Sequence, residues 1–462
     1  MQINEKNFKL FFYYFITIHL IVWTVIPSLT NTNLPLDTIE HLAWGSNLDW
    51  GFDKHPPIVA VVLETFYKIF GSQDWVYYLL SQIFIIISFY YVFKLAEKIF
   101  KSKLLILYSV LLLEGIYFYN FTTPEFNVNV CQLPFWTATV FYSYKIYIEK
   151  KIKFEDCLLV GIFAALGLLS KYLFIYLLIS IEILFFYLVF IKREKKFDFK
   201  YIISLEVFVI ILIPHLIWLA NNDFITIKYG LDRAGVEEKE FVNHFKYPII
   251  FLLKQIGILV PFFFLLFLII KKIKIKFNLK DKNLMFLIFI NFLPIILIFL
   301  TSFILGSKIR TMWMTPFYIN FGILFIYLLK SEIDKKSFDK FIIAFAFIFF
   351  LSPSMYSYIS ISKDNKRTDY PGKEIASIVQ IKWNKNFNNK IIYVVGNEWL
   401  AGNLSYHLKS RPVWFENLNN LSKQLDPNGG IIYTTNTETL KSECSGKFVK
   451  IKNQSFCMIG VK

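Results

Sequence analysis

The sequence predicts an all-α polytopic membrane domain followed by a small α/β domain outside the membrane. Apolar residues make up 56% of the 462, and the mean hydropathy is +0.49. A soluble domain of this length has no interior large enough for so much apolar surface. Long apolar runs alternate with short polar loops, and Lys and Arg gather in every second loop. This distribution of charge is typical of membrane topology.

Eleven apolar runs are candidates for membrane-spanning helices, because a bilayer core of about 30 Å needs about 20 apolar residues per helix. The first run has no small-residue cleavage site, so we expect it to remain as an anchor. The fifth run is short, and only Ser170 and Lys171 separate it from the sixth. The runs are 8–29, 75–95, 104–119, 128–148, 156–170, 172–191, 202–220, 248–270, 284–304, 314–329 and 341–359.

The basic residues orient these spans. With the N-terminus inside, the inner loops hold 23 Lys and Arg residues and the short outer loops hold nine. The positive-inside rule therefore places the N-terminus in the cytoplasm, and eleven spans place the C-terminus outside. The net charge of +16 is explained by this sorting, so we expect no nucleic-acid partner.

Residues 360–462 differ from residues 1–359, which form the predicted membrane domain. They are polar, with strand-like runs at 391–395 and 430–434 between turn residues. We expect a small extracytoplasmic α/β domain. Its two cysteines, Cys444 and Cys457, could form a disulfide in an oxidising compartment, although a chance pair is equally compatible with the sequence.

The first outer loop, residues 30–74, concentrates groups that can carry chemistry. Asp37 and Glu40 are three residues apart, so on a helix they share one face. Lys54 and His55 precede a stiff diproline, and residues 58–70 are typical of a helix lying in the membrane interface. Each acid could be an ordinary solvated loop charge. However, the nearby Lys, His and Trp residues at the membrane surface favour a functional site.

The other outer loops supply a matching set of charges. If all face one cavity, carboxylates suit proton abstraction and fixed cations suit a phosphate leaving group. These charges are Glu125, Lys171, Arg233, Lys308 and Arg310.

Signals for metals and nucleotides are weak. The six His residues show no metal-ligand spacing, although Glu40 and His41 together with His55 could bind a divalent ion. No Gly-rich phosphate loop is present, which argues against ATP or a soluble nucleotide-sugar donor. We therefore assign no metal ligands and no certain cofactor.

Several motifs in the outer loops resemble, in order and spacing, those of bacterial membrane glycosyltransferases. These enzymes are relatives of the dolichyl-phosphate-mannose protein mannosyltransferases and the lipid A aminoarabinose transferases. The resemblance covers most of residues 30–320. The motifs are Asp37-x-x-Glu40-x-Leu42-Ala43-Trp44-Gly45, Trp50-Gly51-Phe52, Lys54-His55-Pro56-Pro57, Thr123-Pro124-Glu125, Gly167-Leu168-Leu169-Ser170-Lys171-Tyr172, Pro214-His215-Leu216-Ile217-Trp218 with Asn222 and Arg233, and Lys308-x-Arg310-x-x-Trp313-x-x-Pro316.

The resemblance implies a GT-C fold and an enzyme of the bacterial cytoplasmic (inner) membrane. Such enzymes move one sugar from a polyprenyl-phosphate carrier to an extracytoplasmic acceptor, which is lipid A in lipopolysaccharide, another surface glycan or a protein. The resemblance implies a catalytic role for Asp37. Many members have a second acid directly after it, whereas here Thr38 follows and the second acid is Glu40. Glu125 stands where the family usually has Asp, for which we expect a supporting role.

The mechanism expected from this resemblance is a single displacement that inverts the anomeric carbon. Asp37, with help from Glu40, would orient or deprotonate the acceptor, and the carrier phosphate would be held by Lys54, His55, Lys171 and Arg310. The main alternative is a flippase or transporter for a lipid-linked sugar, which predicts two matching halves with broken helices. The sequence contains no such repeat. A further alternative is a non-catalytic membrane scaffold.

Overall fold

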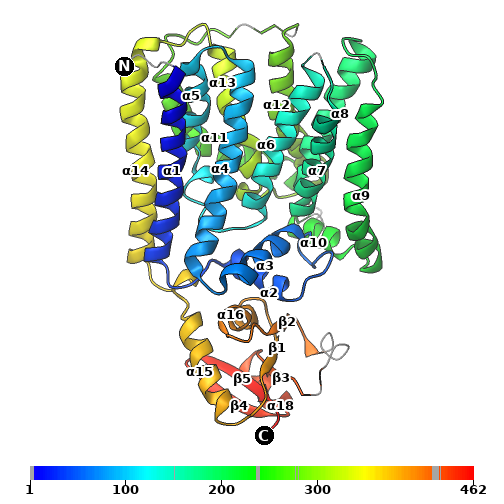
Figure 1. Cartoon of the computed structure of the whole chain (residues 1–462), viewed down its shortest axis with the longest axis vertical. Helices are drawn as coiled ribbons and strands as arrows, with labels where there is room; N and C mark the ends of the chain where they lie inside the picture. Colours follow the sequence, from blue (N-terminus) through cyan, green and yellow to red (C-terminus); the bar gives the residue numbers. More distant parts are fainter. Residues whose placement is uncertain are drawn as a thin grey trace.

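The computed structural model describes residues 5–149, 151–235, 240–275, 277–278, 280–418, 426 and 428–462. Lys150, Lys239 and Lys276, which contribute to the charge counts above, lie outside these ranges. Figure 1 shows an upright bundle of long helices, short helices across its lower end and a small α/β domain beneath them. The lower end is the one that the charge distribution predicts to be outside the cell.

Each of the eleven predicted apolar runs contains a helix in the bundle. The helices are α1 (Glu5–Thr30), α4 (Asp74–Ile99), α5 (Lys103–Leu111), α6 (Val128–Tyr147), α7 (Phe154–Ser170), α8 (Ile175–Phe186), α9 (Lys200–Asn221), α11 (Asn243–Phe267), α12 (Lys282–Leu305), α13 (Phe321–Leu329) and α14 (Phe338–Ser362).

Not all eleven are long and apolar enough to cross a membrane alone. Within the described residues seven are, or eight if α13 and the 3₁₀ segment Thr311–Tyr318, bent by 55°, count as one span. The remaining three are α5, which has nine residues and continues as 3₁₀ turns, α6 and α7. Nearly every side chain of α6 is buried among other helices. Because these neighbours shield it from lipid, it can carry polar residues that an exposed span could not.

Three short helices lie across the lower end of the bundle: α2 (Leu36–Ser46), α3 (Ile58–Phe70) and α10 (Ile225–Arg233). Pro35 directly precedes α2 and Pro57 directly precedes α3, as expected for a residue without a backbone N–H at a helix start. Gly71 ends α3 with a φ of 66°, a conformation that favours glycine. The first outer loop is therefore an ordered two-helix platform.

The motif around His215 fixes this platform to α9. His215 Nδ1 donates to the carbonyl oxygen of Trp50 (2.6 Å), and Trp218 Nε1 donates to Asp49 (2.8 Å). Gly51 lies so close to the Trp218 ring that an added Cβ would come within 2.4 Å of it. His215 and Trp218, three residues apart on α9, therefore anchor the first outer loop to the bundle.

The C-terminal domain has a five-stranded mixed sheet of order β2-β1-β3-β5-β4. Strand β1 pairs in parallel with β2 and β3, whereas β5 pairs antiparallel with β3 and β4. Both predicted strand runs are strands. The elements are α15 (Gly372–Asn384), β1 (Ile391–Val395), α16 (Leu400–His407), β2 (Val413–Phe415), β3 (Gly430–Tyr433), α18 (Thr437–Glu443), β4 (Lys447–Ile451) and β5 (Gln454–Ile459).

The C-terminal domain docks on the first outer loop through close backbone packing and buried polar contacts. A Cβ at Gly402 of α16 would meet Ala43 of α2 at 3.0 Å, so a side chain here would push the two helices slightly apart. Arg411 donates to Glu64 and to the carbonyl oxygen of Leu42, both at 2.6 Å. These contacts fix the domain relative to the platform.

Cys444 and Cys457 form a disulfide, with a Cα–Cα distance of 5.6 Å. The bond ties the end of α18 to the interior strand β5. We expect replacement of both cysteines by Ser to lower the stability of the domain by about 2–4 kcal/mol, mainly because the unfolded chain regains freedom. Denaturant titration with and without a reductant measures this. An unchanged midpoint in the oxidised wild type and the double variant would contradict it.

Candidate active site

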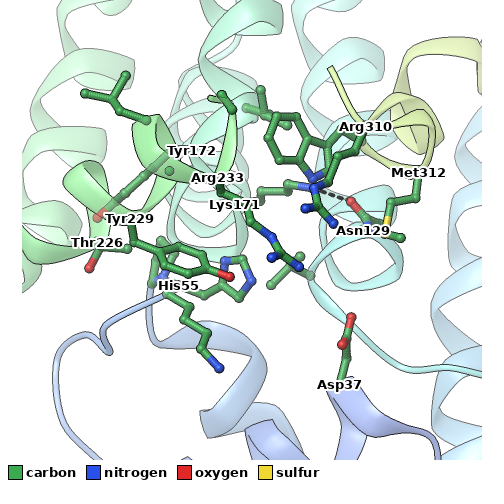
Figure 2. A pocket seen from close by; sticks show the side chains of 18 of the residues that line it. Asp37, His55, Asn129, Lys171, Tyr172, Thr226, Tyr229, Arg233, Arg310 and Met312 are labelled. Carbon is green, nitrogen blue, oxygen red and sulfur yellow. Dashed lines mark hydrogen bonds between the residues drawn. The ribbon is translucent and has the colours of Figure 1, made fainter. Parts of the chain in front are cut away.

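A cavity of about 880 Å³ lies between the lower end of the helix bundle, the platform and the C-terminal domain. Residues from eight separate stretches of chain line it, and Figure 2 shows how some of their side chains converge. The lining includes seven of the nine residues predicted from the sequence: Asp37, Glu40, Lys54, His55, Lys171, Arg233 and Arg310.

Asp37 lies in the first turn of α2, where the exposed N–H groups of the helix favour a negative charge. Its own backbone N–H donates to Glu125 Oε1 at 3.1 Å. Burial, together with the Asp37 carboxylate, raises the pKa of Glu125 to about 8. Glu125 is not among the lining residues. It therefore supports the helix end that presents Asp37 to the cavity.

Glu40 faces the same cavity one turn further along α2, where it forms an ion pair with Lys54. Burial raises the pKa of Glu40 to about 7, and the Lys54 ammonium acts in the opposite direction. Lys54 also pairs with Glu398 of the C-terminal domain at 2.8 Å. Burial lowers the pKa of Lys54, but the two carboxylates outweigh it and hold that pKa above its ordinary value. Lys54 is thus a charged bridge between the platform and the domain.

His41 and His55 stack face to face, with ring centroids 5.7 Å apart. His41 Nδ1 donates to the carbonyl oxygen of Asp37. Burial lowers the pKa of both imidazoles, and that of His55 falls further because Lys171 and other cations lie nearby. Neither ring adds a positive charge at neutral pH. Among the described residues, no three His, Cys, Asp or Glu side chains form a group that could hold a metal ion.

Lys171 sits at the turn between α7 and α8 and points into the cavity (Figure 2). Its ammonium donates to Asn129 and lies 5.5 Å from the centre of the Trp313 ring. Burial lowers the pKa of Lys171 to about 7, and Asp37 opposes this shift. Lys171 is therefore a cation that can lose its proton near neutral pH.

Arg233, Arg310 and Lys171 form the side of the cavity that we call the membrane wall. The two arginines supply its permanent charges. Within the described part of the chain, no carboxylate lies within salt-bridge distance of either guanidinium. A pocket with unpaired guanidinium groups is suited to an anion such as a phosphate. Lys308 is exposed and does not line the cavity, although its backbone N–H anchors the turn to Ala234 at 2.7 Å.

The sequence missed the part of the site that the C-terminal domain contributes. Arg367, Asn397, Glu398, Trp399 and Leu400 line the cavity opposite the membrane wall. One signal was present, because residues 397–400 directly follow a strand, and ligands of α/β sheets gather at the carboxyl ends of strands. Asn129, the partner of Lys171, was also missed, since an amide inside a predicted span carries no charge signal.

Comparisons with known proteins show which fold this geometry belongs to. Residues 54–218 match the family model described as dolichyl-phosphate-mannose-protein mannosyltransferase. The crystal structure of ArnT from Cupriavidus metallidurans bound to undecaprenyl phosphate matches with a TM-score of 0.64 and 12% identity, over 96% of this chain and 97% of that one. The apo structure of the same protein matches with a TM-score of 0.62, 12% identity and the same coverage. No curated protein sequence matches the chain.

These matches confirm the resemblance drawn from the sequence motifs. The chain is a multi-pass membrane protein with the GT-C glycosyltransferase fold, and the small sheet domain at its C-terminus is part of the match.

Proposed function

We propose that the protein is a glycosyltransferase that moves a sugar from a polyprenyl-phosphate carrier to an extracytoplasmic acceptor. One observation carries the proposal most strongly. A carboxylate on a helix N-terminus and two guanidinium groups, which have no carboxylate partner among the described residues, face one cavity at the predicted outer membrane surface. A carboxylate suits an acceptor hydroxyl, and the guanidinium groups suit a departing phosphate. The similar ArnT structure holds undecaprenyl phosphate, which supports a carrier of this class.

In the proposed mechanism, Asp37 accepts the proton of the acceptor hydroxyl as its oxygen attacks the anomeric carbon. The bond between that carbon and the phosphate oxygen breaks, and the electron pair leaves with the carrier phosphate. Arg233, Arg310 and protonated Lys171 stabilise the charge that develops on this phosphate. Attack from the Asp37 side and departure on the opposite side invert the anomeric centre.

Glu40 and Lys54 have different parts in this proposal. Because Lys54 is already balanced by Glu40 and Glu398, it contributes less net positive charge than the two arginines. We propose that the pair keeps Glu40 ionised and holds α2 in register with the C-terminal domain.

The proposal is tested by mass spectrometry of surface lipids, glycans and glycoproteins from cells with and without the gene. We expect one sugar residue to be absent from a single class of acceptor in the deletion strain and to return with the wild-type gene. The mass of that residue identifies the donor sugar. An unchanged profile, combined with loss of transport of a lipid-linked sugar, would favour the flippase alternative.

The pKa of Lys171 predicts a pH dependence for carrier binding. Lys171 is protonated below its pKa of about 7 and loses its charge as the pH rises through it. Loss of a charged hydrogen bond should weaken binding of undecaprenyl phosphate by about tenfold between pH 6 and pH 9. The second ionisation of a phosphate, near pH 6, would strengthen binding over the same interval. A measured decrease in affinity would therefore come from titration of the protein and not of the lipid phosphate.

Lys171→Arg is the matched variant for this measurement, since its guanidinium stays charged at every pH used. We expect its affinity, measured by titration in detergent, to decline less with rising pH than that of the wild type, because only the titration of Glu40 and Glu125 remains. If the variant and the wild type decline equally, Lys171 does not cause the pH dependence.

A further inference from the structure

The wall that the C-terminal domain adds to the cavity has its own binding chemistry. Trp399 rests against Tyr370, with ring centroids 5.2 Å apart, and the Arg367 guanidinium lies 5.7 Å from the centre of the Trp399 ring. Trp399 is only partly buried, and Arg367 is exposed. Both line the cavity that contains Asp37. An indole face beside a guanidinium can stack on a sugar ring and contact an anionic substituent of that ring.

The polar groups of this wall are available to a ligand. Within the described residues, Arg367 has no carboxylate within salt-bridge distance, and the indole N–H of Trp399 has no hydrogen-bond partner. By contrast, the indole N–H groups of Trp218, Trp383 and Trp414 all donate to protein oxygens. Arg367 and Trp399 are thus a donor pair without protein acceptors, facing the cavity.

The position of this pair relative to Asp37 is fixed by backbone hydrogen bonds. The carbonyl oxygen of Thr368 accepts from the backbone N–H groups of Thr32 and Asn33, at 2.9 and 3.0 Å. Thr368 directly follows Arg367, and Asn33 lies four residues before Asp37. The two sides of the cavity are therefore held together by the short segments that carry their key residues.

Two more hydrogen bonds order the residues on either side of Trp399. Asn397 Oδ1 accepts from the backbone N–H of Leu400 at 2.8 Å, which closes the turn that presents Trp399. The Tyr370 hydroxyl donates to Gln454 at 2.8 Å, which fixes the ring beneath Trp399. A site held in this way has little conformational freedom to lose when it binds.

We infer that Arg367 and Trp399 form an acceptor subsite for a glycan that carries an anionic group on the sugar next to the reacting hydroxyl. The inference rests on the proposed transferase function and adds the acceptor class to it. The membrane wall of Arg233, Arg310 and Lys171 faces the carrier phosphate, and the domain wall faces Asp37 from the other side. The acceptor hydroxyl then lies between the subsite and the donor sugar.

The subsite is tested with soluble probes on the full-length protein in detergent, first saturated with undecaprenyl phosphate. The lipid occupies the cations of the membrane wall, so that any further binding reports on the rest of the cavity. Glucose 6-phosphate and glucose are then titrated and followed by saturation-transfer NMR, and inorganic phosphate is titrated as a competitor of glucose 6-phosphate. We expect glucose 6-phosphate to bind more tightly than either of the other two.

Variants assign this binding to the two residues. Arg367→Ala and Trp399→Ala should each weaken glucose 6-phosphate binding by about tenfold or more, through loss of a charged contact or of the stacking surface. Trp399→Phe, which keeps an aromatic face, should retain most of the affinity. Lys441→Ala removes an exposed cation of the same domain on α18 and should have no effect. Affinity for undecaprenyl phosphate should be unchanged in all four.

Several results would overturn the inference. One is displacement of glucose 6-phosphate by the lipid, because the sugar phosphate would then have occupied the carrier site. Others are equal binding of glucose or inorganic phosphate, or tighter binding of a phosphoserine peptide, which would indicate a protein acceptor. None of these results bears on whether a sugar is missing from the deletion strain, so the proposed transferase function is judged separately.

Discussion

Asp37→Asn is expected to lower the rate of sugar transfer by about 10²–10⁴-fold, the usual contribution of a general base. The amide keeps the shape of the side chain and cannot accept the proton of the acceptor hydroxyl. Carrier binding should persist, because the cations of the membrane wall are untouched. Single-turnover transfer and undecaprenyl phosphate affinity, measured on the same preparation, separate the two effects.

Asp223→Asn is a suitable control for this variant. Asp223 is exposed at the same end of the bundle, does not line the cavity and has a φ of 52°, which Asn tolerates well. We expect it to transfer sugar at the wild-type rate. If Asp37→Asn also does so, Asp37 does not act as the base, and Glu40 becomes the next residue to test.

Arg411→Ala should destabilise the docking of the C-terminal domain by about 3–5 kcal/mol, the usual cost of removing one partner of a buried ion pair. The Arg411 side chain is 15% exposed and that of Glu64 is 8% exposed. The guanidinium also lies 4.0 Å from the centre of the Tyr67 ring. Its removal leaves the Glu64 carboxylate buried without a counter-charge. Thermal unfolding and limited proteolysis between residues 362 and 372 measure the effect.

The double variant Arg411→Ala, Glu64→Gln separates two effects on stability: a Glu64 carboxylate left without a counter-charge, and the loss of packing against Tyr67. Because the amide needs no counter-ion, we expect the double variant to be more stable than Arg411→Ala alone. Equal stability of the two would mean that packing against Tyr67, and not the ion pair, holds the domain in place.

The convergence of Asp37, Lys171 and Arg310 could be predicted from the sequence because membrane topology determines on which side of the membrane each loop lies. Once alternate loops are assigned to one side, every charge in them lies within a single thin layer. The motif order then indicated that they face one pocket. The same reasoning also included Lys308, which does not line the cavity. Topology determines the side of the membrane on which a residue lies but not the direction of its side chain.

Other parts of the site depend on packing that no local pattern encodes. Glu125 reaches the backbone of Asp37 only because the turn before α6 packs against the start of α2. Arg367 and Trp399 line the cavity because the C-terminal domain docks on the platform, where Gly402 of α16 packs closely against Ala43 of α2. The membrane-spanning helices show a related effect. The apolar runs predicted where these helices lie, whereas the breaks in helical structure after α5 and before α13 follow from tertiary contacts.

The order in which the chain is synthesised gives the docking of α16 on α2 a further consequence. A ribosome that has completed residues 1–359 has delivered Asp37, Lys171 and Arg310 to the membrane, but the cavity still lacks the wall that residues 367 and 397–400 supply. On the topology that the charges predict, translocation and folding of the last hundred or so residues would complete the enclosure. A truncated chain would then leave that side of the cavity open to water.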